Sequence, residues 1–312
     1  MNDYEAMVNA YKNTGGEDIF SNNDVAHLVL ERDKIVGAHE VEGLKVDAKK
    51  IDNNKVDVNI TVKSGYKIEK PVHMCFGVLP KEGKQIIDLN IVIEDEGEVE
   101  VVADCIFPNA VRVEHIMDGN IYVGRNGSYT YNEKHYHGDS GGVKVVSKAK
   151  IIQDEGSYMQ SVFTLLKGRV GEIDFDYQAE LNARATLEML ARISGYADDK
   201  VKIREAGYLQ GEGARGLLDS KIALRDKARA DIYNEMTAEA AEAKGHVDCT
   251  EIIKDEATAR AIPIVDVRHS EAKITHEAAI GSVDTSQLET LMARGLTEEE
   301  ATDVIIQGLL NG

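Results

Sequence analysis

The amino-acid sequence predicts a mainly β protein in which short strands stack as a solenoid, with a short helical segment at each end. The first observation is alternation: across residues 25–267, apolar residues recur at every second position in short runs such as Val56-Val58-Ile60-Val62. The second is repetition, because similar turn segments recur about 15 or about 30 residues apart. One coil cannot bury its apolar face alone, so a fixed period in a strand-rich region indicates coils that stack on each other.

Residues 1–24 are expected to form a helical segment before the strands begin. Ala6, Met7, Ala10 and Tyr11 lie on one face if this stretch is helical. The pair Gly15-Gly16 then ends the pattern.

Residues 25–277 form the predicted strand region, and most of it is assigned to the solenoid. Its turn segments are centred on Gly97, Gly127, Gly156, Gly213, Lys227, Glu256 and Glu271. A β-sandwich or barrel also places turns between short strands, so this alternative stays open. We favour the solenoid because a sandwich or barrel does not require its turns to recur at one period.

Residues 278–312 are expected to form a pair of helices. Asp284 is a candidate N-cap for the first, Gly295 is placed to end it, and Thr297 with Glu300 forms a capping box that opens the second. Apolar residues at helical spacing are Leu288, Leu291, Met292, Ala301, Val304, Ile305 and Leu309. Acidic residues outnumber basic ones here, which argues against a DNA-reading helix-turn-helix. The apolar face either binds a partner or packs back on the solenoid.

Charge and cysteine content exclude several classes of partner. The chain has 55 acidic and 36 basic residues and a formal charge of -19, so nucleic acid and anionic membrane surfaces are poor partners. No run of about 18 apolar residues is present, which excludes a membrane-spanning helix. Three scattered cysteines do not make a disulfide scaffold, and a cytoplasmic location fits best.

Gly211, Gly213 and Gly216 spell GxGxxG, the pattern of a dinucleotide-binding turn. Such a turn must lead from a strand into a helix, whereas these glycines precede the alternating residues 220–226 of a predicted strand. We therefore interpret them as solenoid turn residues. The sequence has no GxxxxGK[ST] phosphate loop, so the chain is not expected to hydrolyse nucleotides itself.

Two histidines and two cysteines are secondary candidates for metal binding. His135 and His137 share one face of a strand, a spacing that can chelate a metal. Cys75, Cys105 and His135 are equally spaced along the sequence, so coils as long as that spacing would stack them in one column. The alternative is that the histidines are exposed or hydrogen-bonded and that the cysteines serve in packing.

Cys249, His276 and Glu277 form the stronger constellation. The separation of Cys249 and His276 along the sequence is close to one coil, which would put thiol and imidazole on neighbouring strands. A thiolate and an imidazole suit iron, zinc or persulfide chemistry, and a carboxylate can complete an iron site. The alternative is structural: Cys249 is a small buried residue, and His276 and Glu277 cap the solenoid. Spacing alone does not decide between a metal or sulfur site and this structural role.

An ordered series of motifs resembles the SufB/SufD family of iron-sulfur cluster assembly proteins. The matching stretches are GHVDCTE at 245–251, AIP at 261–263, AKITHEAAIG at 272–281, QL at 287–288 and RGLTEEEA at 294–301. PVHMCFG at 71–77 and FPNA at 107–110 look like the short, archaeal-type members. The chain lacks the N-terminal CxxC-type cluster of long SufB proteins.

The resemblance implies a right-handed parallel β-helix that serves as a scaffold and not as an enzyme. It implies a transient iron-sulfur cluster assembled at a dimer interface, with Cys249 at the essential cysteine of SufB, Glu277 at an acidic ligand and His276 at the interface histidine. It further implies an ATPase partner, SufC, docked on the C-terminal helices, together with a sulfur donor and an iron source. A homodimer and a heterodimer with another SufB/SufD-like chain both stay open. The alternatives are a β-helix enzyme acting on a carbohydrate polymer and an adaptor that carries no cluster.

Overall fold

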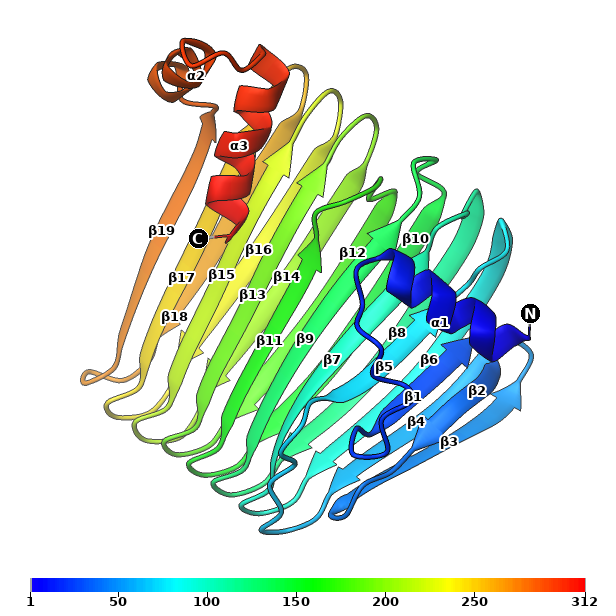
Figure 1. Cartoon of the computed structure of the whole chain (residues 1–312). Coiled ribbons are helices and arrows are strands. Elements are labelled where there is room, and N and C mark those ends of the chain that lie inside the picture. The colour runs from blue at the N-terminus through cyan, green and yellow to red at the C-terminus, as the bar shows by residue number, and fades with distance from the viewer. Residues whose placement is uncertain (1, 312) are drawn as a thin grey trace.

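The computed structural model describes residues 2–311 as one long stack of strands with helices at both ends (Figure 1). Helix α1 (Asp3–Asn13) comes first, and α2 (Thr285–Met292) and α3 (Glu298–Asn311) come last. The strands between them are β1 (His27–Glu31), β2 (Lys34–His39), β3 (Leu44–Asp52), β4 (Lys55–Val62), β5 (Val72–Gly77), β6 (Glu82–Ile93), β7 (Glu98–Phe107), β8 (Arg112–Val123), β9 (Ser128–His137), β10 (Val143–Gln153), β11 (Tyr158–Leu165), β12 (Glu172–Leu181), β13 (Thr186–Gly195), β14 (Lys200–Leu209), β15 (Arg215–Leu224), β16 (Arg229–Ala238), β17 (Lys244–Ile253), β18 (Thr258–Val267) and β19 (Lys273–Ser282).

The strands form two sheets that face each other, and successive strands alternate between them. Sheet A holds β1, β2 and the odd-numbered strands from β5 to β19, and sheet B holds β3 and the even-numbered strands from β4 to β18. Neighbouring coils pair in parallel, as Val113 with Val143 in sheet B and Arg215 with Lys244 in sheet A. The mainly β fold and the parallel solenoid predicted from the sequence are therefore confirmed.

Every second side chain points between the sheets, as the period of a strand requires. These inward positions carry mostly Val, Ile, Leu and Ala, and Ile173, Leu187, Ile203 and Leu218 are at most 1% exposed. Polar residues occupy a minority of the inward positions, and these exceptions form the sites described below.

The repeated turn segments stack as two ladders, one at each end of the strands, and those centred on Lys227 and Glu256 belong to the second. The first ladder joins each even-numbered strand to the next odd-numbered strand. One residue in each turn has a left-handed backbone, with φ between 53° and 71° at Glu96, Asn126, Gly156, Arg184, Gly213 and Glu242. Its amide donates to the next coil, as Gly156 N does to the Ala183 carbonyl oxygen at 2.9 Å. Gly213 belongs to this ladder, whereas Gly216 lies in β15; the GxGxxG pattern leads into a strand, as predicted, but only part of it is turn.

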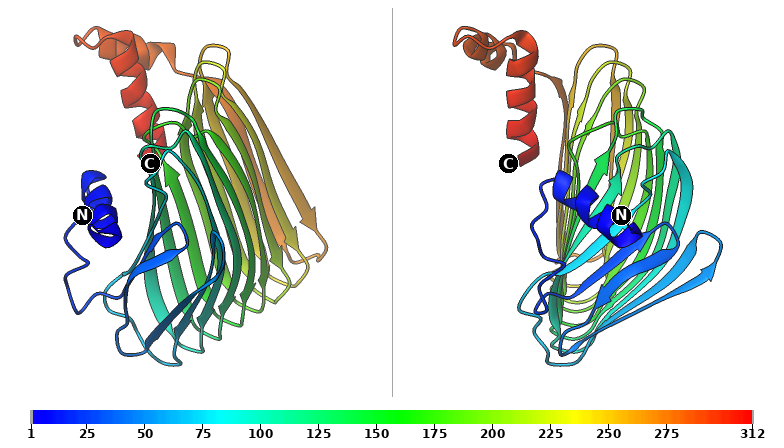
Figure 2. Two further views of the ribbon diagram at one scale, coloured as in Figure 1. Left: turned by 90° about the vertical axis from the view of Figure 1, so that its right-hand side faces the viewer. Right: turned by 45° about the vertical axis from the view of Figure 1, so that its right-hand side comes forward.

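The N-terminal end of the stack is closed by antiparallel strands and by α1 (Figure 2). Strand β2 pairs antiparallel with β1, and β3 pairs antiparallel with β4. Helix α1 begins in a capping box between Asn2 and Glu5 and lies on the outer face of sheet A. There, Met7 packs against Cys75 and Ile106.

The C-terminal end of the stack is open. Strand β19 continues to Ser282, beyond residue 277, where the sequence placed the end of the strand region. Val267 of β18 and Ile280 of β19 occupy inward positions but are 45% and 46% exposed, because no further coil among residues 2–311 covers them. Helices α2 and α3 lie to the side of this end, on the outer face of sheet A (Figure 2).

Helix α3 contacts sheet A mainly with residues that lie beside the apolar face named from the sequence. Ile306 and Leu310 are buried with Ala223 of β15, and Arg225 forms an ion pair of 2.7 Å with Asp303. Of the apolar face named from the sequence, Ala301 is buried, whereas Val304 is 47% exposed. No helix within residues 2–311 has the length and apolar character needed to cross a membrane.

Candidate functional site

Cys249 lies in the interior of the last covered coil. It is on β17, it is 0% exposed, and Asn234 of β16 donates its side-chain amide to the sulfur at 3.5 Å. The same amide nitrogen of Asn234 also reaches the hydroxyl of Ser220 at 2.9 Å. Burial, and next the charge of Glu251, raises the pKa of the Cys249 thiol to about 12. The thiol is therefore protonated until a metal ion or a change in its surroundings displaces the proton.

Glu251 lies two residues along the same inward face of β17. It is 1% exposed, and neither carboxylate oxygen has a hydrogen-bond partner among the described residues. Burial is the main reason that its pKa rises to about 7. A carboxylate without partners beside a buried thiol gives this end of the solenoid a second metal-ligating group.

His276 and Glu277 lie on β19, the neighbour of β17, but they face opposite sides of the sheet. His276 pairs with Val247 and Glu277 pairs with Asp248, whereas Cys249 pairs with Ala278. His276 therefore shares the inward face with Cys249, and Glu277 lies on the outward face. Both residues are exposed. Within one chain, the structure brings Cys249 and His276 to one face and does not bring Glu277 to them.

A second polar cluster lies in the solenoid interior near its N-terminal end. Ligand atoms of Cys105, His115 and His135 lie within 4.8 Å of one another. Glu133 joins them, with its Oε1 at 2.7 Å from His135 Nε2 and at 3.9 Å from Cys105 Sγ. His137 follows, with its Nε2 at 3.2 Å from His135 Nδ1. Each of these side chains is at most 7% exposed.

Burial governs the protonation of this cluster. It lowers the pKa values of His115, His135 and His137 to about 3, so all three imidazoles are neutral at pH 7. It raises the pKa of Glu133 to about 7 and the pKa of the Cys105 thiol well above its usual value. Neutral imidazoles are the form that binds metal ions.

Cys75 does not join the predicted column. Cys105 pairs with His135, as the equal spacing predicted, but Cys75 pairs with Asp104. The coil between β5 and β7 is one residue shorter, so Cys75 faces outward and packs under Met7 of α1. The expected stack of Cys75, Cys105 and His135 is therefore wrong in its first member.

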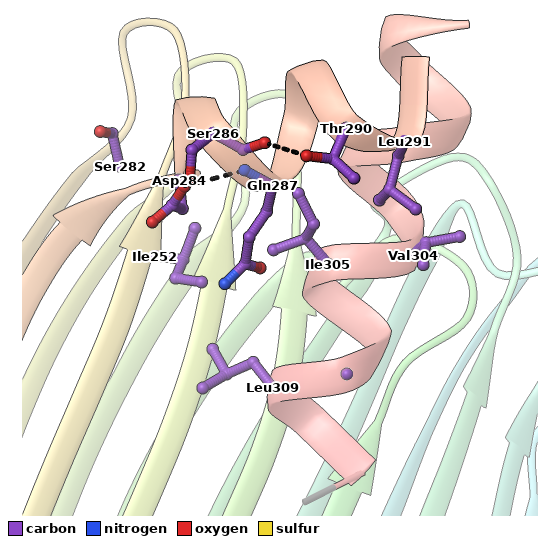
Figure 3. Close-up of a pocket in the computed structure, with 11 residues that line it drawn as sticks. Ile252, Ser282, Asp284, Ser286, Gln287, Thr290, Leu291, Val304, Ile305 and Leu309 are labelled. Carbon is purple, nitrogen blue, oxygen red and sulfur yellow. Dashed lines mark hydrogen bonds between the residues drawn. The ribbon is translucent and has the colours of Figure 1, made fainter. Parts of the chain in front are cut away.

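A groove of about 600 Å³ runs between α2, α3 and the outer face of sheet A (Figure 3). Apolar residues that line it are Ile252, Leu291, Val304, Ile305 and Leu309. No residue of α2 is buried, and Met292 is 42% exposed while Leu288 is partly buried. The helix pair thus presents an apolar surface that the rest of the described chain leaves uncovered.

Sequence reasoning missed Glu251, Glu133 and His115. One signal for them is present: each is a polar residue at an inward position of an otherwise apolar alternation, as in Val247, Cys249 and Glu251 of β17. Such a residue requires a partner in the interior.

The described chain is a parallel β-solenoid with three buried free cysteines and an open C-terminal end. Residues 80–309 match the family model described as SUF system FeS cluster assembly, SufBD core domain. The chain is 40% identical to the iron-sulfur cluster assembly SufBD family protein of Methanocaldococcus jannaschii over 91% of this chain and 89% of the relative. It is 37% identical to the SufBD family protein of Pyrococcus horikoshii over 99% and 94%, and 24% identical to SufB of Bacillus subtilis over 80% and 54%. The chain belongs to the SufBD family of iron-sulfur cluster assembly proteins.

Proposed function

We propose that this chain is the scaffold subunit on which a transient iron-sulfur cluster is assembled at a dimer interface. The observation that carries the proposal is the position of Cys249, in the last covered coil, with Glu251 beside it and His276 on the same face of the open coil. Thiolate, imidazole and carboxylate together suit iron. The cluster is the cargo of the scaffold, supplied by a sulfur donor and an iron source in the cytoplasm.

The partner across the interface is a second copy or another SufB/SufD-like chain. Strand β19 ends sheet A with one side unpaired within residues 2–311, and Ile280 is exposed on it. Pairing at this edge covers exposed apolar residues and brings two sets of Cys249, His276 and Glu277 together. A ligand set drawn from two chains gives Glu277 a role although it faces away from Cys249 of its own chain.

The helix pair is proposed to dock the ATPase SufC, which supplies the nucleotide energy that the chain itself does not. The contact residues are Leu288, Leu291, Met292, Val304, Ile305 and Leu309, most of which line the groove of Figure 3. The ion pair between Arg225 and Asp303 and the contact of Lys254 with Glu298 at 3.1 Å fasten α3 to the solenoid. A movement of docked SufC subunits is thereby transmitted to the coils that hold Cys249.

Anaerobic reconstitution of the SufC complex tests the cluster site. Cys249→Ser keeps the size of the side chain but removes the soft ligand, so we expect a folded chain, destabilised by at most about 1–2 kcal/mol, that holds no cluster. Cys75→Ser is the matched control, because Cys75 is equally buried but lies on the outer face under α1. Visible absorption and bound iron and sulfide per complex are the readouts. A Cys249→Ser protein that holds as much iron and sulfide as the parent would contradict the assignment.

A pull-down with SufC tests the docking surface. Deletion of the residues after Gly281 should leave a β-rich chain that no longer binds SufC, and Val304→Glu should weaken binding by placing a charge in the groove. Gln307→Glu is the control, since Gln307 is exposed but does not line the groove. Binding that survives both the deletion and Val304→Glu would refute docking at this site.

Two other functions are less well supported. A carbohydrate-active β-helix needs a charged groove, and one lies over sheet B, but its Lys55 and Asp88 already form an ion pair of 2.6 Å. An adaptor without a cluster would keep the SufC contact and leave Cys249 dispensable. Family membership favours the scaffold over the enzyme, and the Cys249→Ser experiment separates the scaffold from the adaptor.

A further inference from the structure

We propose that Cys105, His115, His135 and Glu133 form a buried site for one divalent transition-metal ion, Zn²⁺ or Fe²⁺, separate from the cluster site at Cys249. One thiol sulfur, two imidazole nitrogens and one carboxylate oxygen are a common donor set for a four-coordinate ion of this class. The Cys105, His115 and His135 ligand atoms lie within 4.8 Å of one another. An ion is favoured because hydrogen bonds orient the two imidazoles toward the thiol and the carboxylate.

Gln85 determines which nitrogen of His115 is free. Gln85 Nε2 donates to the backbone carbonyl of Arg32 at 2.8 Å, so the amide oxygen is the atom that faces His115 Nδ1 at 3.0 Å. An amide oxygen only accepts, so His115 Nδ1 carries the proton and Nε2 holds a lone pair. That lone pair faces Cys105 Sγ at 3.8 Å.

His137 determines which ring nitrogen of His135 is free of a proton. His137 Nδ1 faces the backbone carbonyls of Arg169 at 3.0 Å and Val170 at 3.2 Å, so it must donate. With neutral rings, His137 Nε2 is then an acceptor, and His135 Nδ1 donates to it across 3.2 Å. The remaining nitrogen, His135 Nε2, therefore holds a lone pair that faces Glu133 Oε1 at 2.7 Å.

The result is a buried pocket toward which four potential metal-ligand atoms point. His115 Nε2, His135 Nε2, Glu133 Oε1 and Cys105 Sγ converge, and backbone or amide carbonyls hold the outer nitrogens of His115 and His137 in orientation. In metal sites, such outer contacts fix the tautomer of ligating histidines. Two protons can fill this pocket, one shared by Glu133 and His135 Nε2 and the other on the Cys105 thiol, which faces His115 Nε2. One divalent ion takes the place of both protons, which leave to solvent, and contacts all four ligand atoms.

The spacing suits a tetrahedral ion after a small adjustment. Metal-ligand distances of about 2.3 Å to sulfur and about 2.0 Å to nitrogen or oxygen place sulfur about 3.5 Å from the other ligands. The sulfur of Cys105 lies 3.8 Å from His115 Nε2 and 3.9 Å from Glu133 Oε1. The atoms of Glu133 and His135 must separate by roughly 0.6 Å, which is the change expected when an ion replaces a hydrogen bond.

His137 is the member of the buried cluster that also lines a surface groove. This residue lines a surface groove of about 610 Å³ beside α1, together with Ala10, Tyr136 and Lys167. Its Nε2 lies 3.2 Å from His135 Nδ1, so this residue connects the groove with the cluster.

Cobalt binding to a variant with a single thiol tests the proposal. The chain has three cysteines, all free, so Cys75→Ser with Cys249→Ser leaves Cys105 as the only sulfur ligand. Metal-free protein is titrated anaerobically with Co²⁺, which takes tetrahedral zinc sites. We expect one Co²⁺ per chain, a thiolate-to-cobalt charge-transfer band, intense tetrahedral d–d bands, and displacement by Zn²⁺. The matched control changes Cys105 to Ser in the same Cys75→Ser, Cys249→Ser protein, and it should lack the charge-transfer band.

A second variant keeps all three thiols and removes only the carboxylate charge. Glu133→Gln should weaken Co²⁺ binding by about tenfold or more while circular dichroism and melting match the parent. Absence of the charge-transfer band in a folded Cys75→Ser, Cys249→Ser protein would overturn the proposal. Cobalt affinity unchanged by Glu133→Gln in the all-thiol protein would overturn the assignment of Glu133.

Discussion

Replacement of Glu205 by Gln should stabilise the protein increasingly as pH rises. Glu205 lies on an inward position of β14 and is 5% exposed, and its Oε2 has no hydrogen-bond partner among the described residues. Burial, and then the charge of Asp219, raises its pKa from 4.5 to about 8, against an opposing effect of Arg192. The buried carboxylate is therefore a destabilising group whenever it must ionise, and a glutamine amide in its place would not ionise.

The magnitude follows from the two pKa values. They differ by about 3.5, which at about 1.36 kcal/mol per pKa unit is about 5 kcal/mol when the group is fully ionised. The folded chain binds the proton more tightly than the unfolded chain, so its free energy of unfolding falls as pH rises from about 4.5 to about 8. The advantage of Glu205→Gln over the parent should be below about 1 kcal/mol at pH 5 and about 3–5 kcal/mol at pH 9.

Equilibrium urea unfolding at pH 5, 7 and 9, followed by circular dichroism, measures this difference. Glu212→Gln is the control, because it removes the same charge at an exposed turn residue. Its free energy of unfolding should remain parallel to that of the parent. A difference between Glu205→Gln and the parent that stays constant from pH 5 to pH 9 would refute the reasoning.

Three further changes test the packing. Phe175→Ala should lower the free energy of unfolding by about 3–5 kcal/mol, because the ring is 3% exposed and lies edge-on to Phe163; urea unfolding measures the loss. Gly168→Ala should lower the melting temperature, since Gly168 has φ +81° and an added Cβ would collide with the carbonyl oxygen of His137; an unchanged melting temperature would contradict this. Asp303→Asn should change stability by less than about 1 kcal/mol but loosen α3, because its ion pair with Arg225 is partly exposed; faster amide exchange confined to α3 is the expected signature.

The sequence predicted the solenoid but not the register on which the sites depend. Strand alternation has a period of two, so a change of one residue in coil length moves a side chain to the other face. Glu98 pairs with Ser128, and a coil of this length keeps Cys105 and His135 together. Val72 pairs with Val101, which makes the preceding coil one residue shorter and separates the faces of Cys75 and Cys105.

The same rule applies at the C-terminal site. Lys244 pairs with Lys273, and this register puts His276 on the face of Cys249 and Glu277 on the other. The separation of these residues along the sequence does not show which face each one occupies until the length of the coil is known. The turn segments that would give it are too variable to fix a length to one residue.

The orientation of α3 could not be predicted from the sequence, for a different reason. Apolar residues lie on more than one side of this helix, and periodicity does not state which side faces the sheet. Ile306 and Leu310 pack against Ala223, so Val304 and Ile305 remain at the groove. A choice of this kind depends on tertiary contacts, which a single helix sequence does not contain.

The two ends of the solenoid carry different strands, and this difference bears on how copies of the chain could stack. At one end β2 and β3 run antiparallel to their neighbours and α1 packs alongside, whereas at the other β18 and β19 are uncovered in the described part of the chain. Stacks of parallel strands with two adhesive ends can polymerise head to tail without limit, as fibrils do. A molecule with one pairing end forms a dimer and offers no free end to a further copy. The antiparallel β2 and β3 give the far end of the stack an edge unlike that of β18 and β19, so the pairing proposed at β19 does not by itself produce a head-to-tail filament.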